Sequence, residues 1–244
     1  MIAEGKNAVT EVLKSNVTVE KVLVQKDNAS HAVYELAREC RARKIPVQQV
    51  DKAALDRLSV SGRHQGILAV CTEFTYSELD ELLEKDERAE EEGLLLIVLD
   101  GVEDPHNVGA IIRVADCAGA NGIILPKRRN CGVTDTAVKV SCGAAGHVKV
   151  AKVNNVNDAI RELKERGVTV FATDMDGDDV YKTNLTGDVA FVIGGEGHGI
   201  HDLTRKLCDG VVALPQRGKI NSLNASVATG IVVYECVRQK GERK

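Results

Sequence analysis

Three segments of this 244-residue chain combine residue types that could bind a polar ligand and act on it. The first, DPHNVGAIIRVADCAGA, contains Asn107 and Arg113; the second, FVIGGEGHGI, contains Glu196; the third, SLNASVATG, contains Ser222 and Asn224. Amide and hydroxyl groups orient a substrate by hydrogen bonding, and a guanidinium can stabilise negative charge that develops during a reaction. The three segments are therefore candidate parts of a functional site.

Each segment also has an ordinary structural interpretation, which the residues alone leave open. Asn107 could cap a helix, and Arg113 lies off the apolar stripe of that helix, where solvated arginines are common. The glycines around Glu196 permit a tight turn against a ligand, but the acidic residue that a dinucleotide fold needs about 20 residues later is missing. One small polar residue of the third segment must serve as an ordinary N-cap.

The apolar pattern places these segments at the ends of predicted strands. Six short aliphatic runs with little polar alternation are typical of parallel strands covered on both faces: LLLIVLD, GIIL, VKVAKV, VTVFAT, VAFVIG and GVVAL. Helical periodicity between and after them predicts helices over 107–120, 157–167, 199–208 and 224–239. This pattern predicts a doubly wound α/β domain, in which ligands bind beyond the carboxyl ends of the strands.

A second, smaller α/β pattern precedes this domain. Over residues 1–72, short aliphatic runs alternate with helical periodicity, as in a small α/β sandwich. Residues 73–92 are rich in glutamate and low in complexity, which predicts an acidic linker whose first half is helical. We therefore expect a small N-terminal domain over 1–72, a linker over 73–92 and the doubly wound domain over 93–244.

The formal net charge of −4 is unevenly distributed. Residues 73–92 carry 2 basic and 10 acidic side chains, whereas the net charge is +3 over residues 1–72 and +1 over residues 93–244. Both flanking regions can therefore present basic patches, such as residues 41–44 and 127–129, to a nucleic acid. Ordinary solvated surface charge explains each cluster equally well.

Cysteine usage and hydropathy narrow the class of protein. The seven cysteines are scattered, with no C-x-x-C pair to indicate zinc or a redox dithiol and no histidine signature to indicate a catalytic thiol. The first residues lack the pattern of a secretory signal, and no stretch reaches the roughly 20 apolar residues that span a bilayer. We expect a cytoplasmic protein with no metal and no membrane partner.

Taken together, the three segments resemble the ordered motifs of the SpoU/TrmH family of RNA ribose 2'-O-methyltransferases. Asp-Pro-x-Asn-x-Gly-x-x-x-Arg, Gly-x-Glu-Gly-x-Gly and Ser-Leu-Asn-x-Ser-x-Ala occur in the family's order across about residues 95–230. The N-terminal region, through GKNAVTEVL and SGRHQGILAV, resembles the ribosomal-protein-like RNA-binding domain that is fused to the ribosomal RNA branch of this family.

The resemblance implies a fold that composition and periodicity do not reveal. Family members have an α/β methyltransferase domain whose C-terminal segment is threaded into a deep trefoil knot, an exception to the rule that chains avoid knots. The knot binds S-adenosylmethionine, and the proteins are homodimers with active sites near the interface. By position in the motifs, backbone groups of three residues are expected to contact this cofactor: Gly194, Leu214 and Leu223.

The resemblance also assigns the catalytic positions to Arg113, Asn107, Glu196, Ser222 and Asn224. For Arg113, family proposals include a base-like role, but a guanidinium is a poor proton acceptor near neutral pH. We favour a clamp that binds the substrate phosphate and stabilises the developing alkoxide. The other four side chains are expected to orient the arginine or the ribose, and Glu196 could equally be structural, tying down its glycine loop.

The resemblance favours one substrate among several. The N-terminal domain indicates the branch that methylates a guanosine of large-subunit (23S) ribosomal RNA in the peptidyl-transferase region, with ribosomal RNA as the partner. A transfer-RNA ribose methyltransferase shares the three motifs. A non-catalytic RNA-binding assembly protein and a nicotinamide-dependent dehydrogenase are alternatives from other classes, and they are disfavoured by the intact polar motifs and by the missing acidic residue, respectively.

Overall fold

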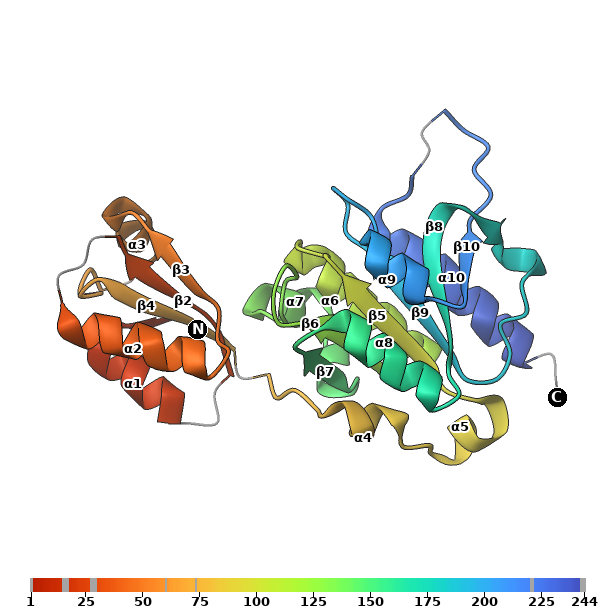
Figure 1. The fold of residues 1–244 in the computed structure, drawn as a ribbon, viewed down its shortest axis with the longest axis horizontal. Helices are drawn as coiled ribbons and strands as arrows, with labels where there is room; N and C mark the ends of the chain where they lie inside the picture. The colour runs from red at the N-terminus through yellow and green to blue at the C-terminus, as the bar shows by residue number, and fades with distance from the viewer. Residues whose placement is uncertain are drawn as a thin grey trace. The chain divides into compact units, whose positions relative to one another are not determined.

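The computed structural model describes residues 2–14, 18–26, 30–59, 61–72, 74–219 and 222–241. The chain divides into two compact units, residues 1–75 and residues 76–244 (Figure 1). Both units mix helices and strands, which confirms the predicted α/β class with a small N-terminal domain and a larger C-terminal domain.

The N-terminal unit is a four-stranded sheet with helices on both faces. Its sheet order is β1-β4-β2-β3, with β4 antiparallel to both neighbours and β3 parallel to β2. Because successive strand residues face opposite sides, Val22 and Val24 pack under α1 and α2, whereas Leu23 packs with Leu55 of α3. The elements are β1 Ile2–Glu4, α1 Gly5–Lys14, β2 Thr18–Gln25, α2 His31–Ala42, β3 Val47–Val50, α3 Lys52–Leu58 and β4 Ile67–Thr72.

The C-terminal unit is built on a six-stranded parallel sheet of order β10-β8-β9-β5-β6-β7. All six predicted strands are present. Every residue of β5 and β6 is buried, as expected for parallel strands with helices on both faces. The strands are β5 Leu95–Asp100, β6 Gly122–Pro126, β7 Val150–Val153, β8 Thr169–Asp179, β9 Val189–Gly194 and β10 Gly210–Ala213.

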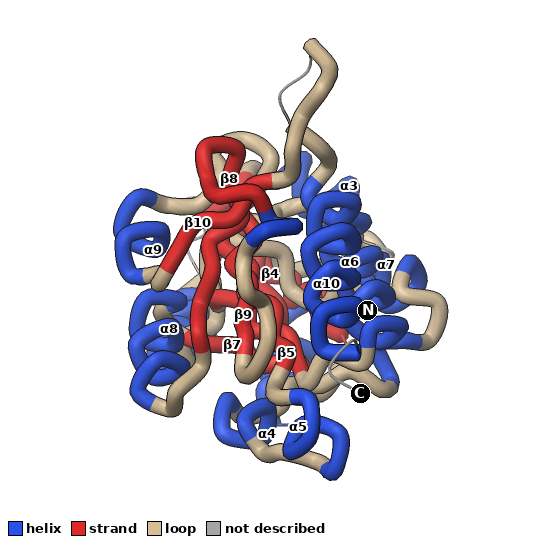
Figure 2. The backbone as a smooth tube through the Cα atoms, turned by 90° about the vertical axis from the view of Figure 1, so that its right-hand side faces the viewer, coloured by secondary structure: helices blue, strands red, loops and turns tan. Residues whose placement is uncertain are grey.

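Helices cover the two faces of this sheet as separate layers. In Figure 2, α8 and α9 lie on one side of the strands and α6, α7 and α10 lie on the other. The four predicted helices are present, and α7 is an additional short helix that the apolar pattern does not reveal. These helices are α6 Pro105–Ala118, α7 Asp135–Val140, α8 Val156–Glu165, α9 Asp202–Leu207 and α10 Ala225–Gly241, with short 3-10 turns at Ala144–Gly146 and Val180–Lys182. None of the helices within the described ranges is long and apolar enough to cross a membrane.

Most of the acidic segment differs from the predicted linker. Residues 76–92 belong to the second unit and contain α4, Leu79–Leu83, and α5, Glu87–Glu92. Leu82 and Ala89 are buried in the core of that unit. A short apolar stripe among many glutamates is therefore enough to hold this segment against the domain, although its composition indicates a solvated linker.

Candidate active site

A pocket of about 790 Å³ opens at the carboxyl edge of the parallel sheet, where ligands bind in doubly wound folds. It lies beyond the ends of β9 and β10, beside the middle of β8 and the start of α10. The lining combines apolar side chains, glycines that expose their backbone groups, and a few polar side chains. This composition is typical of a small-molecule site. The lining residues are Thr173, Asp174, Met175, Ile193, Gly194, Gly195, Glu196, Gly197, His198, Gly199, Leu214, Gln216, Ser222, Leu223, Asn224, Ala225 and Ala228.

The loop after β9, which carries Glu196, packs directly on the backbone at the end of β5. A Cβ atom on Gly195 would lie 1.9 Å from the carbonyl oxygen of Gly101, and one on Gly194 would lie 2.3 Å from the carbonyl carbon of Gly199. Gly199 adopts a φ of 64°, in the left-handed region that favours glycine. Glycine is therefore needed here for close backbone approach, in addition to turning the chain.

Asp100, which is buried at the end of β5, holds both ends of this loop, one through its carboxylate and the other through its backbone carbonyl. Asp100 is 5% exposed, and its Oδ2 accepts a hydrogen bond from the backbone N–H of His201 at 2.9 Å. The His201 ring Nδ1 lies 2.9 Å from the Asp100 Oδ1, and the backbone N–H of Gly195 donates to the carbonyl of Asp100 at 3.1 Å. Neither Asp100 nor His201 belongs to the motifs, and the only signal in the sequence is an acidic residue ending an apolar run.

Three side chains from three distant segments meet at the rim of the pocket. The Glu196 Oε1 accepts hydrogen bonds from the Asn107 Nδ2 at 2.8 Å and the Asn224 Nδ2 at 3.0 Å. The Asn224 Nδ2 also donates to the Asn107 Oδ1 at 2.9 Å. The structure therefore brings together one predicted polar residue from each of the three motifs. We call this group the Glu196 cluster.

The two asparagines differ in their relation to the helices that carry them. Asn107 does not cap α6, because Asp104 does so by accepting from the N–H of His106 at 2.9 Å. Asn107 instead lies inside the first turn, 4% exposed, with its side chain committed to the Glu196 cluster. Asn224 has both roles, since its Oδ1 accepts from the N–H groups of Ser226 and Val227 at the start of α10.

The residues expected to contact a cofactor all line the pocket. Gly194 ends β9, Leu214 follows β10, and Leu223 precedes α10 with 41% of its surface exposed. Ser222 lies beside them in the same lining. Sequence reasoning missed Thr173, which also lines the pocket. Its buried Oγ1 has no hydrogen-bond partner among the described residues, so a polar group of a bound ligand would satisfy it.

Arg113 stands apart from the pocket. It lies six residues beyond Asn107, which places it about 9 Å farther along the α6 axis. Its side chain is exposed, and its Nη1 lies 3.7 Å from the Sγ of Cys142. A single chain therefore assembles the Glu196 cluster without the predicted catalytic arginine. No group of three or more potential metal-ligating side chains occurs among the described residues.

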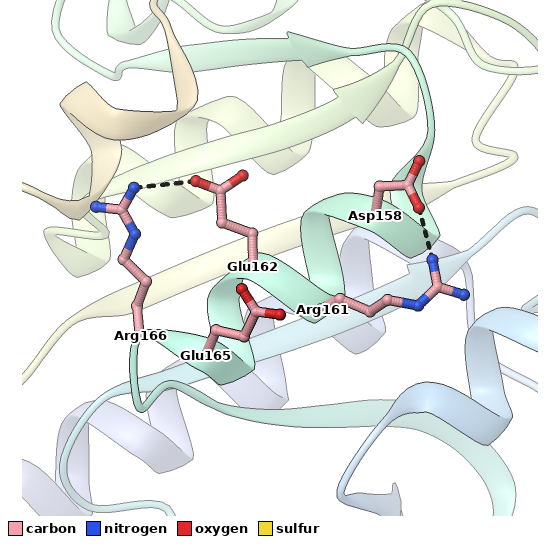
Figure 3. Close-up of a pocket in the computed structure, with 5 residues that line it drawn as sticks. All are labelled: Asp158, Arg161, Glu162, Glu165 and Arg166. Atoms are coloured by element: carbon pink, nitrogen blue, oxygen red, sulfur yellow. Dashed lines mark hydrogen bonds and ion pairs between the residues drawn. The ribbon is translucent and has the colours of Figure 1, made fainter.

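A shallow hollow over α8 is a poor alternative site. Figure 3 shows that it is lined by charged side chains of one helix, with Arg161 bonded to Asp158 and Arg166 bonded to Glu162. These charges neutralise one another at an exposed surface. The carboxyl-edge pocket is therefore the candidate active site.

Comparison with known families identifies both parts of the chain. Residues 94–234 match the model described as the SpoU rRNA methylase family, and residues 2–77 match the model described as RNA 2'-O ribose methyltransferase substrate binding. A TrmH family tRNA/rRNA methyltransferase of Bacillus subtilis is 41% identical over 97% of this chain and 94% of its own length. A Staphylococcus aureus protein of the same description is 39% identical over 97% of this chain and 95% of its own length.

Solved structures give the same result for the fold. The SpoU methyltransferase AviRb from Streptomyces viridochromogenes, in complex with the cofactor AdoMet, superposes with a TM-score of 0.63 at 26% identity, covering 99% of this chain and 91% of its own. An AdoMet-bound rRNA methyltransferase from Sinorhizobium meliloti has a TM-score of 0.61 at 28% identity, covering 97% of this chain and 86% of its own. The likeness extends over both units of the chain.

Proposed function

The chain belongs to the SpoU rRNA methylase family, and on that premise we propose that it methylates the ribose 2'-hydroxyl of a guanosine in large-subunit ribosomal RNA. Family membership makes it an S-adenosylmethionine-dependent RNA methyltransferase. The observation that carries the proposal is the Glu196 cluster at the rim of a pocket of about 790 Å³. The substrate-binding match over residues 2–77 supports an RNA substrate.

The pocket fits the methyl donor, which supplies a methyl group on a positively charged sulfonium. Backbone groups of Gly194, Leu214 and Leu223 would hold the adenosine part, a mode that suits the donor and acceptor edge of a base. The Thr173 hydroxyl would gain the partner that it lacks among the described residues. The Glu196 carboxylate in the same lining complements a sulfonium charge.

The chemistry requires the ribose oxygen to approach the methyl carbon in line with the bond that breaks. A C–O bond forms, the C–S bond breaks, and the hydroxyl proton passes to a base or to solvent. We assign orientation of the ribose to Asn107, Glu196, Ser222 and Asn224, three of which fix one another through hydrogen bonds.

Arg113 enters this scheme through a second copy of the chain. We assign it the clamp role, binding the substrate phosphate and stabilising the developing alkoxide. Since it lies outside the pocket of its own chain, a homodimer that brings α6 of one copy to the pocket of the other would supply it. The trefoil knot formed by the C-terminal segment stays a prediction of family membership.

A transfer RNA is the second candidate substrate, because the curated relatives are described as tRNA/rRNA methyltransferases. One experiment distinguishes the two. The full chain is incubated with S-adenosylmethionine and unmodified large-subunit ribosomal RNA or transfer RNA, and 2'-O-methylated nucleosides are quantified by mass spectrometry after digestion. We expect 2'-O-methylguanosine from ribosomal RNA, lost in Arg113→Ala. Product from transfer RNA alone would select the second candidate, and full activity of Arg113→Lys would contradict the clamp.

A further inference from the structure

Three consecutive cationic side chains occupy the loop after β6, at the same edge of the sheet as the pocket. Lys127 is half-buried, and Arg128 and Arg129 are exposed. None of the three forms an ion pair with a carboxylate in the described part of the chain. We call residues 127–129 the basic loop.

The basic loop contrasts with the cations on other surfaces of the same unit. Many of those are neutralised by neighbouring acids, so they offer little net charge to a partner. The pairs are Lys85 with Asp188, Arg161 with Asp158, Lys164 with Asp209, Arg166 with Asp80 and Glu162, Lys182 with Asp179, Arg205 with Asp174 and Asp176, and Arg238 with Glu235. Arg113, Lys139, Lys206, Arg217 and Lys219 also form no ion pair among the described residues, but none of them belongs to a run of three consecutive cations as the basic loop does.

Hydrogen bonds anchor the start of the basic loop and the residue that follows it. The N–H of Lys127 donates to the carbonyl of Val153 at 2.8 Å, and the N–H of Val102 donates to the Asn130 Oδ1 at 2.7 Å. Arg129 has a φ of 59°, a left-handed conformation that costs a residue with a side chain about 1 kcal/mol.

The position of the basic loop relative to the pocket suggests what it binds. The pocket lies over β8, β9 and β10, and β6 stands two strands from β9 on the other side, about 10 Å away. The β5 and β6 side is the side of the Glu196 cluster opposite β8 and β10, so a ribose that approaches from there does not cross the cofactor pocket. We propose that the basic loop binds phosphates of the RNA strand next to the target nucleotide, an inference that rests on the proposed function.

The test compares two variants that each remove three positive charges. Lys127→Gln/Arg128→Gln/Arg129→Asn neutralises the basic loop, with asparagine chosen because it tolerates the left-handed conformation. Arg161→Gln/Lys164→Gln/Arg166→Gln is the matched control on α8. Affinity of the full chain for transcripts of large-subunit ribosomal RNA and of transfer RNA is measured between 50 and 200 mM salt. Binding of S-adenosylmethionine is measured separately by calorimetry.

We expect the basic-loop variant to bind the preferred transcript about ten-fold more weakly than the wild type. The slope of the logarithm of the association constant against the logarithm of the salt concentration should be less steep by about 2. The control variant should stay within about two-fold of the wild type, since its charges are already paired, and S-adenosylmethionine affinity should be unchanged in both. Equal RNA affinity and equal slope for the basic-loop variant and the wild type would overturn the inference. A wild type that binds S-adenosylmethionine but neither RNA would instead overturn the proposed function.

Discussion

At the scale of single residues, the site depends on hydrogen bonds that few other arrangements could replace. The buried amide of Asn107 donates to Glu196 through Nδ2 and accepts from Asn224 through Oδ1. A buried polar group left without its partner costs about 1–3 kcal/mol. Each member of the Glu196 cluster is therefore held by the other two, which fixes the rim of the pocket before any ligand binds.

Two substitutions of Glu196 separate its hydrogen bonds from its charge. Glu196→Gln keeps an oxygen that can accept from Asn107 and Asn224, so methyl transfer should fall only a few-fold. Glu196→Ala removes both bonds, and the resulting misplacement should lower kcat/KM by about 100-fold. Steady-state methylation with matched thermal unfolding curves measures both effects. If the glutamine variant loses as much activity as the alanine variant, the negative charge matters more than the geometry.

The reactivity of the individual cysteines tests whether any of them could be a catalytic thiol. Burial raises the pKa of Cys208 to about 12 and the pKa values of Cys40 and Cys236 to about 11, because it disfavours the thiolate. Near pH 8 these three thiols should resist iodoacetamide, while the exposed Cys117 and Cys142 react. Peptide mass spectrometry of the briefly labelled native protein reads this out. Labelling of Cys208 ahead of Cys117 would show that the thiolate argument is wrong.

The sequence allows the motif residues to be predicted, but not the residues that hold them in place. Asn107, Glu196 and Asn224 stand in recognisable patterns, and the structure joins them. Asp100 and Thr173 could not be found in this way, because a single polar residue after an apolar run has no spacing that distinguishes it. Their importance depends on contacts between strands that are distant in the chain.

At the scale of secondary-structure elements, the start of the glycine loop after β9 has no room for a side chain. Gly195→Ala would place a Cβ atom 1.9 Å from the Gly101 carbonyl oxygen, and neither backbone can move without disturbing β5 or β9. Gly197 has open space around its missing Cβ. We expect Gly195→Ala to weaken S-adenosylmethionine binding by at least about ten-fold and Gly197→Ala to leave it within about two-fold. Calorimetric titration measures both, and equal affinities would refute the close-packing argument.

The number of buried residues in each element explains which elements could be predicted from the sequence. The six parallel strands and four main helices follow from aliphatic runs and helical periodicity, since each buries several consecutive or regularly spaced side chains. Helix α7 has six residues and one buried side chain, Ala137, so it leaves too little periodicity to detect. Helices α4 and α5 could not be predicted as part of the domain, because most of their residues are exposed and many are glutamates. Only Leu82 and Ala89 are buried, which is too few to give a clear apolar pattern.

At the scale of the whole molecule, the helical layer of α6, α7 and α10 has an exposed apolar face. Val227 and Tyr234 lie seven residues apart on α10, which puts them on the same side of the helix, and they are 50% and 49% exposed. Val138 on α7 is 37% exposed, and both helices pack against α6, which carries Arg113. This face supports the proposed homodimer, and no pattern within one chain could have located it because its counterpart is another copy.

Mixing two variants with complementary defects, assayed at an S-adenosylmethionine concentration too low to saturate Gly195→Ala, tests whether Arg113 acts across that dimer. Arg113→Ala keeps an intact pocket, and Gly195→Ala keeps an intact arginine. In a two-fold symmetric dimer with shared sites, a mixed dimer has one complete site. Random exchange after co-expression should then restore roughly one quarter of wild-type methyl transfer. If Arg113 instead serves the pocket of its own chain, every site in the mixture lacks one component, and the activity should stay at the level of the separate variants. The methylation assay therefore decides between the two arrangements without requiring a structure of the complex.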